Sequence, residues 1–293
     1  MRKYLDPALI AQLHRLELKA RLVVEGSLSG MHKSPYRGFS VEFAEHKSYF
    51  PGDDIRYIDW KLYGKTEKYF IKQYEEDTNL KGYIVLDTSA SMGFGKDKLS
   101  KFDYAGKIAV ALSYLMLSQR DSVGLLAFNN DIVKYVPPRN NMIHLQNIIS
   151  VIDNLNTRYD TGICKAFQYL ASRIRRRGLI VLISDLIDDQ GKVLNYLRYL
   201  RHMKHELIIL HVVHPNELEL PYHGTVRFKN MEYSDTLMAA PDRIRKDYQS
   251  KIQSFIDTYR AGCWQEHIDY GIVRVDEPVE KAVLDIIARR KKR

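Results

Sequence analysis

The chain has 293 residues, of which 45% are hydrophobic and 28% charged, and its formal net charge is +9 at pH 7. This composition is ordinary for a globular protein, and the length suits one large domain with an appendage or two domains. No apolar run approaches the roughly 20 residues that a membrane helix requires, so insertion into a membrane is not expected.

The N-terminal part of the chain is predicted to form one helix and an extension of short strands. Residues 7–24 carry apolar residues at helical spacing, with Pro7 near the start and Gly26 just past the end. Residues 27–80 are rich in Gly, Tyr and charge and have no long helical period. The segment 38–79 is rich in large aromatic residues, among them Phe39, Phe43, Tyr49, Phe50, Tyr57, Trp60 and Tyr63. We therefore expect residues 1–80 to pack on the core of the remaining chain.

From residue 81 onward, apolar strands alternate with helices. Strands are predicted at 81–87, 121–128, 131–136, 178–184, 206–213 and 269–275, with a further possible strand at 225–233. Helices are predicted at 101–119, 141–155, 162–176, 190–202, 241–260 and after Asp276. Continuous apolar strands alternating with helices predict an α/β domain over 81–293, with a mostly parallel central sheet and helices on both faces.

The stretch YIVLDTSASMGFG, residues 83–95, leads an apolar strand directly into Asp87, Ser89 and Ser91. Side chains at alternate positions of an extended loop face the same way, so these three oxygen donors are expected to converge. In a parallel sheet, ligands gather beyond the carboxyl ends of the strands. A serine-rich turn with no function is the alternative when this stretch is considered alone.

Two later segments add oxygen donors at the same edge of the predicted sheet. Thr161 precedes the helix predicted from 162, and Asp185 ends the strand at 178–184. Oxygen ligands without Cys or His favour a hard cation, so we expect Mg²⁺ or Mn²⁺ at this site. Because hydroxyls leave much of the charge of the ion uncompensated, the ion has reason to take an acidic ligand from outside.

The DTSASM stretch resembles the D-x-S-x-S signature of the metal-ion-dependent adhesion site (MIDAS) of von Willebrand factor type A domains. Thr161 and Asp185 match the second and third loops of that site. A second segment, residues 38–79, is similar to the hallmark of the bacterial domain-of-unknown-function 58 family, where this segment leads into a type A-like domain. Its sequence is GFSVEFAEHKSYFPGDDIRYIDWKLYGKTEKYFIKQYEEDTN. The chain departs from many type A domains at Asp160 and Leu186, where they have glycine.

This resemblance implies a non-enzymatic binding protein with Asp87, Ser89, Ser91, Thr161 and Asp185 as metal ligands, the aspartates binding directly or through water. It also implies a chaperone-like adaptor that works with a MoxR-type AAA+ ATPase on a client protein offering an acidic side chain. The two cysteines, Cys164 and Cys263, show no CxxC or metal spacing, which favours a reducing compartment. The N-terminus lacks a signal-peptide core, so a cytoplasmic location is expected.

Two other functional classes stay open on the sequence. A metal-dependent phosphotransferase or hydrolase would use Asp87, but the position two residues later, where such phosphotransferases carry an acid, is Ser89. A nucleic-acid-binding protein would use the basic clusters RIRRRG (173–178) and ARRKKR (288–293). A solvated helix end and a ragged tail explain those clusters more simply.

The stretch YFPGDDIRYIDWK contains Asp53, Asp54 and Asp59 near Arg56. A structural reading is favoured: a Pro-Gly turn, Arg56 paired with an aspartate, and Trp60 packed on the type A core. A partner-binding surface and an acidic catalytic cluster are the alternatives.

Overall fold

The computed structural model of the chain describes residues 41–49, 58–76, 80–95, 100–232 and 235–291. These residues fall into two compact units, one within 28–79 and the other from Leu80 onward. The helix predicted at 7–24 and the residues Phe39, Phe50, Asp53, Asp54, Arg56 and Tyr57 lie outside the described residues.

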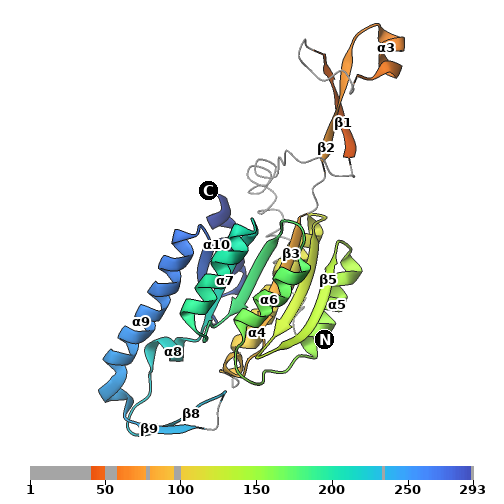
Figure 1. The fold of residues 1–293 in the computed structure, drawn as a ribbon. Helices are drawn as coiled ribbons and strands as arrows, with labels where there is room; N and C mark the ends of the chain where they lie inside the picture. The colour runs from red at the N-terminus through yellow and green to blue at the C-terminus, as the bar shows by residue number, and fades with distance from the viewer. Residues whose placement is uncertain (1–40, 50–57, 77–79, 96–99, 233–234, 292–293) are drawn as a thin grey trace. The chain divides into compact units, whose positions relative to one another are not determined.

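A six-stranded sheet forms the centre of the larger unit (Figure 1). Its strands are β3 (Lys81–Asp87), β4 (Ser122–Phe128), β5 (Ile132–Arg139), β6 (Leu179–Ser184), β7 (Glu206–Val213) and β10 (Asp269–Arg274). The order across the sheet is β10-β7-β6-β3-β4-β5, and every neighbouring pair is parallel except β4 and β5. The predicted fold class, a mostly parallel sheet between two helical layers, is confirmed.

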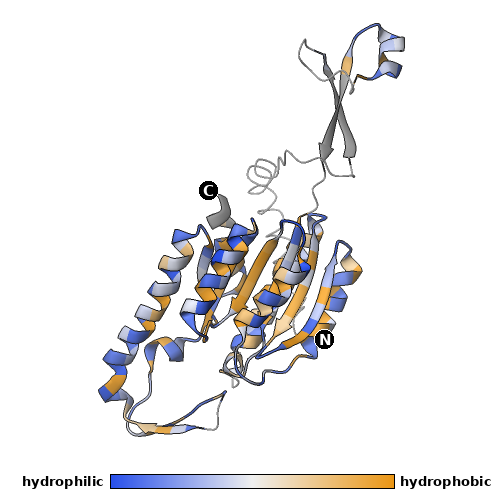
Figure 2. Ribbon diagram, in the orientation of Figure 1, coloured by the Kyte–Doolittle hydropathy of each residue, from blue (hydrophilic) through white to orange (hydrophobic). Residues whose placement is uncertain are grey.

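Helices cover both faces of this sheet. One layer holds α4 (Lys101–Ser118), α5 (Met142–Asp153) and α10 (Val279–Lys291), and the other holds α6 (Ile163–Arg173), α7 (Gln190–His202) and α9 (Pro241–Gln265). Alternate residues of β3 face the two layers: Ile84 and Leu86 pack in the first core, Tyr83 and Val85 in the second. Figure 2 shows the central strands as the most hydrophobic part of the unit. No helix in the described ranges is both long and apolar enough to span a membrane.

The outer strand β5 runs antiparallel to β4 and contains Pro137 and Pro138. The sequence predicted a strand only as far as Val136, because proline has no N–H to donate to a neighbouring strand. The structure carries the strand on to Arg139, which is tolerated because β5 lies at an edge of the sheet.

A small hairpin separates β7 from α9. After the short helix α8 (Pro215–Glu219), strands β8 (Val226–Lys229) and β9 (Thr236–Ala239) pair antiparallel with each other and not with the central sheet. The sequence indicated a possible strand near β8 but did not predict β9. In Figure 1 this hairpin lies beyond the end of the sheet at which the parallel strands finish.

The smaller unit consists of β1 (Val41–Ser48), α3 (Trp60–Thr66) and β2 (Phe70–Glu76), with β1 and β2 antiparallel. Asp59 caps α3 by accepting hydrogen bonds from the backbone N–H groups of Lys61 (3.0 Å) and Leu62 (3.1 Å). This contact gives Asp59 a structural role of the kind that the sequence favoured. The packing of Trp60 on the larger unit stays a prediction.

Candidate functional site

The polar residues predicted from the sequence lie at the carboxyl edge of the central sheet. Asp87 is the last residue of β3, and Asp185 directly follows the last residue of the neighbouring strand β6. Ser91 begins the short 3₁₀ helix η2 (Ser91–Gly93). The side chains of Asp87, Ser89, Ser91 and Asp185 are buried. A buried polar group is costly unless it is paired, so the partners of each side chain decide what this edge can do.

The Asp87 carboxylate is held by two hydrogen bonds. Its Oδ1 accepts from the backbone N–H of Ser89 (2.8 Å), and its Oδ2 accepts from the hydroxyl of Ser184 on β6 (2.5 Å). Burial and the nearby charge of Asp185 raise the pKa of Asp87 to about 7, against the opposing effect of these hydrogen bonds. Asp87 is therefore held in one orientation, and its two hydrogen bonds only partly offset the cost of a buried negative charge.

Ser91 joins the separate parts of the site. Its hydroxyl lies 3.0 Å from the hydroxyl of Ser89, and it acts to lower the pKa of the nearby carboxylates of Asp185 and Glu232. The β3 loop, the end of β6 and the β8–β9 hairpin thus meet at one side chain. The structure thus brings Ser89, Ser91 and Asp185 close together, while their role as metal ligands stays a prediction.

Thr161 reaches the site through backbone contacts between two loops. The N–H of Ala90 donates to the carbonyl of Tyr159 (2.7 Å), and the N–H of Arg158 donates to the carbonyl of Thr88 (3.0 Å). These bonds hold the Thr161 loop beside the β3 loop. The Thr161 hydroxyl donates to Oε1 of Glu232 (3.1 Å), so it shares an acidic neighbour with Ser91.

Asp185 is paired with a buried lysine. Lys101, the first residue of α4, has a fully buried side chain whose ammonium donates to Asp185 Oδ2 (2.8 Å) and Glu217 Oε1 (2.6 Å). Burial lowers the pKa of Lys101, but the two carboxylates outweigh it and raise this pKa to about 12. Burial acts to raise the pKa of Asp185, and Lys101 outweighs it, so the net shift is downward.

Four residues at this edge were not predicted: Ser184, Lys101, Glu217 and Glu232. Ser184 stands next to Asp185 in the chain, which is the one sequence signal that pointed to it. Glu217 lies in α8, Lys101 begins a helix, and Glu232 lies in the turn of a hairpin, so no shared motif or spacing connects them. Their contribution depends on tertiary contacts that only the folded chain reveals.

The predicted ligands offer only oxygen atoms, which suit a hard cation. Asp87, Ser89, Ser91, Thr161 and Asp185 supply carboxylate and hydroxyl oxygens, the ligands that Mg²⁺ and Mn²⁺ take in proteins. Across the described ranges, no three His, Cys, Asp or Glu side chains cluster as a metal site, so the hydroxyls are essential to such a site. The Lys101 ammonium already offsets part of the negative charge, which makes a weakly held cation the expectation.

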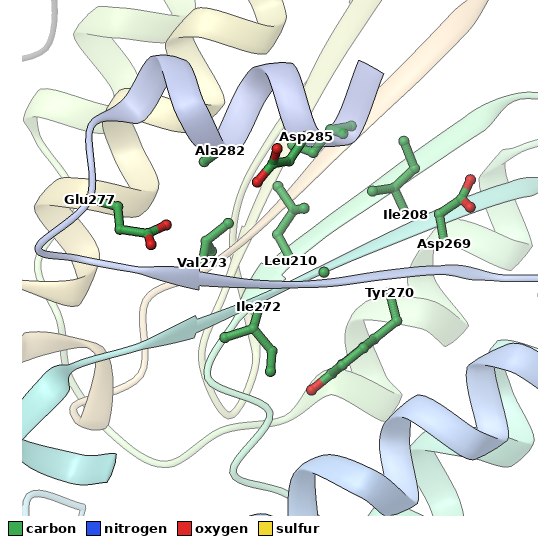
Figure 3. Close-up of a pocket in the computed structure, with 11 residues that line it drawn as sticks. Ile208, Leu210, Asp269, Tyr270, Ile272, Val273, Glu277, Ala282 and Asp285 are labelled. Carbon is green, nitrogen blue, oxygen red and sulfur yellow. The ribbon is translucent and has the colours of Figure 1, made fainter. Parts of the chain in front are cut away.

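A separate pocket lies against β7, β10 and α10 (Figure 3). Its lining is largely aliphatic, including Ile208, Leu210 and Ile272, with Asp269 and Asp285 beside them. None of the residues at the carboxyl edge lines this pocket. The polar site is therefore distinct from it.

Comparison with known proteins gives one family and several relatives. Residues 45–255 match the family described as "Protein of unknown function DUF58". The "Uncharacterized protein Rv1480" of Mycobacterium tuberculosis is 32% identical over 234 residues, which cover 78% of this chain and 72% of that protein. The "Uncharacterized protein Mb1516" of Mycobacterium bovis matches with the same figures.

Solved structures with a similar fold include BatB from Bacteroides thetaiotaomicron, with a TM-score of 0.48 and 18% identity over 73% of this chain and 100% of that one. An aerotolerance-related membrane protein from Bacteroides fragilis gives a TM-score of 0.49, also at 18% identity and the same coverage. The SpRpn10 VWA domain gives a TM-score of 0.44 at 12% identity, over 71% of this chain and 95% of that one.

Proposed function

The chain belongs to the DUF58 family. From that premise we propose that it is a non-enzymatic protein-interaction module that docks an acidic side chain of another protein. The docking point is the polar edge, by which we mean Asp87, Ser89, Ser91, Thr161 and Asp185 at the carboxyl ends of the parallel strands. The observation that carries the proposal is the meeting of three hydroxyls and two aspartates at the carboxyl edge of a parallel sheet. Ser89, Ser91 and Thr161 would be the neutral ligands of Mg²⁺ or Mn²⁺, with Asp87 and Asp185 binding directly or through water. The bound cation would supply the counter-charge for the carboxylate of the partner.

The surroundings of the hydroxyls favour binding over catalysis. A serine nucleophile needs a base within hydrogen-bond reach and a third group to orient that base. The hydroxyls of Ser89 and Ser91 lie 3.0 Å apart, and the carboxylates near them are those of Asp87, Asp185 and Glu232. Hydroxyl and carboxylate oxygens together suit a hard cation better than they suit a serine nucleophile. A phosphotransferase that uses Asp87 remains the alternative, and turnover lost on Asp87→Asn would support it.

The family resemblance supplies the expected partners. We propose that the protein is a chaperone-like adaptor that works with a MoxR-type AAA+ ATPase and a client protein that offers an acidic residue. The electrostatic argument for an acidic partner is that a carboxylate brought to this buried edge, beside Asp87 and Asp185, needs a cation to offset the repulsion.

The test uses Asp87→Ala in the full chain. The circular dichroism spectrum should stay native, because the carboxylate serves the polar edge and not the apolar core. Calorimetric titration should show that Mg²⁺ binding is lost, and co-purification with the ATPase should be lost with it. Asp153→Ala, which removes an exposed carboxylate at the end of α5, is the matched control and should retain both. A complex that survives both EDTA and Asp87→Ala would contradict the proposal and direct attention to the stretch around Trp60.

A further inference from the structure

The turn of the β8–β9 hairpin presents one acidic side chain to the polar edge. Asn230 and Asp235 close the turn, with the N–H of Asn230 donating to the carbonyl of Asp235 (2.9 Å). The N–H of Glu232 donates to the side-chain Oδ1 of Asn230 (2.9 Å). Met231 and Asp235 are exposed, whereas Glu232 is half-buried, accepts a hydrogen bond from Thr161 and lies near the hydroxyl of Ser91. These contacts hold Glu232 beside Thr161 and Ser91, two of the expected metal ligands.

The hairpin itself has little apolar packing to hold it in place. Leu237 and Met238 on β9 are 64% and 58% exposed. Its base is tied to the start of α9, where Arg245 donates to the carbonyl of Tyr222 (2.8 Å) and Asp242 accepts from the N–H of Gly224 (3.2 Å). The base is therefore anchored, while the far end reaches the polar edge through Glu232.

The charge environment makes this contact one that can be exchanged. Burial, with smaller effects from the charges of Asp185 and Asp160, raises the pKa of Glu232 against the opposing effect of the Ser91 and Thr161 hydroxyls. A bound cation would stabilise the Glu232 carboxylate at this position. Another carboxylate carries the same charge and can therefore replace it there.

We propose that Glu232 is an internal acidic ligand of this site, which keeps the β8–β9 hairpin closed over the polar edge until an acidic side chain of another protein replaces it. This inference rests on the proposed function of the edge as a docking point for an acid. It adds that the free protein occupies its own docking point, so partner binding and hairpin opening are one event. Hydrogen bonds to a charged group are strong enough that losing them should raise the ratio of open to closed hairpin about tenfold or more.

The first experiment measures hydrogen–deuterium exchange of the backbone amides of residues 226–239 in the full chain, in Mg²⁺. Glu232→Ala should accelerate their exchange about tenfold or more, as expected for the loss of hydrogen bonds to a charged group. Asp235→Ala removes an exposed carboxylate from the same turn and should leave the exchange as in the wild type. Equal exchange in all three proteins would overturn the inference.

The second experiment measures, by isothermal titration calorimetry in Mg²⁺, the binding of the peptide acetyl-Gly-Glu-Gly-amide, with Gln in place of Glu as the control peptide. Glu232→Ala should bind the Glu peptide about tenfold more tightly than the wild type, because competition for the same hydroxyls has been removed. If the wild type and Glu232→Ala bind the Glu peptide with the same measurable affinity, Glu232 does not compete with the peptide, and the inference is overturned. If neither protein binds the peptide, docking of an acid fails as the function, and the exchange experiment alone decides whether Glu232 holds the hairpin closed.

Discussion

At the scale of single residues, Lys101 governs the electrostatics of the polar edge. Its ammonium is fully buried and neutralises Asp185 while reaching Glu217 on α8. Breaking a buried ion pair by removing one partner is strongly destabilising, since the remaining charge has no compensation. Lys101 therefore links the stability of the fold to the order of the site.

Lys101→Met should lower the free energy of unfolding by about 3 kcal/mol or more, because Asp185 stays buried without its counter-charge. Urea unfolding followed by circular dichroism measures the change. Lys134→Met, on an exposed position of β5, is the control and should have little effect. The contribution of Lys101 has a defined pH range: its folded pKa of about 12 lies above its ordinary value of 10.5, so the stabilisation is complete below pH 10.5 and is lost as the pH rises through 12. Equal stability of wild type and Lys101→Met would contradict this account.

The hydroxyls are expected to matter for the cation and not for folding. Ser89→Ala combined with Ser91→Ala removes two neutral donors that lie 3.0 Å apart and should weaken Mn²⁺ binding measured by calorimetry. A modest affinity is expected for the wild type, because hydroxyl ligands hold a divalent ion weakly without a carboxylate from the partner. Equal Mn²⁺ binding by both proteins would remove these serines from the ligand set.

The sequence predicted much of the site because of one rule of sheet geometry. Asp87 and Asp185 each end a parallel strand, and parallel strands finish at the same edge. No such rule places Glu232, which lies in the turn of a hairpin that pairs with no other strand. Nor does one place Lys101, whose burial depends on two acids that follow it by 84 and 116 residues.

At the scale of elements, α5 is fixed to the sheet by His144. This buried side chain in the first turn of α5 places Nε2 2.9 Å from the carbonyl of Val123 on β4. The helix itself was predicted at 141–155 from its apolar period, and the structure gives Met142–Asp153. The contact with Val123 was not predictable, because it joins residues 21 positions apart with no pattern between them.

Burial lowers the pKa of His144 and outweighs the hydrogen bond to the carbonyl of Val123, which acts to raise it; the nearby charge of Arg139 adds a smaller lowering effect. A folded pKa below the ordinary value of 6.5 means that the neutral ring stabilises the fold fully above pH 6.5, and that this stabilisation is lost as the pH falls below it. His144→Gln should therefore reduce the dependence of the unfolding free energy on pH between about 7.5 and 5. Parallel pH profiles for wild type and variant would show that His144 does not contribute.

At the scale of the whole molecule, the chain combines two compact units of different character. The larger has two apolar cores, one on each face of its sheet. The smaller has a cluster of aromatic rings. Tyr63 stacks on Tyr69 with ring centroids 4.5 Å apart, and Trp60 contacts Tyr63 edge-on with ring centroids 6.2 Å apart. Trp60 is 63% exposed and Tyr69 46% exposed, so the cluster retains aromatic surface that packing against other residues would cover.

Removal of residues 1–79 should lower the melting temperature or cause aggregation of the remaining chain, 80–293. The reason is that the removed segment carries many large rings, each of which contributes on the order of 2 kcal/mol when buried. Differential scanning calorimetry of the full chain and of 80–293 measures the difference. A well-behaved fragment with an unchanged melting temperature would show that the N-terminal segment does not pack on the larger unit.

The two prolines of β5 bear on how copies of this protein behave at high concentration. An exposed edge strand offers unpaired N–H and C=O groups to the strand of another molecule, which is a route to aggregation. Pro137 and Pro138 leave β5 with two fewer N–H donors, and Lys134 adds an exposed charge to the strand. The sheet therefore carries its own protection against edge-to-edge growth on the β5 side.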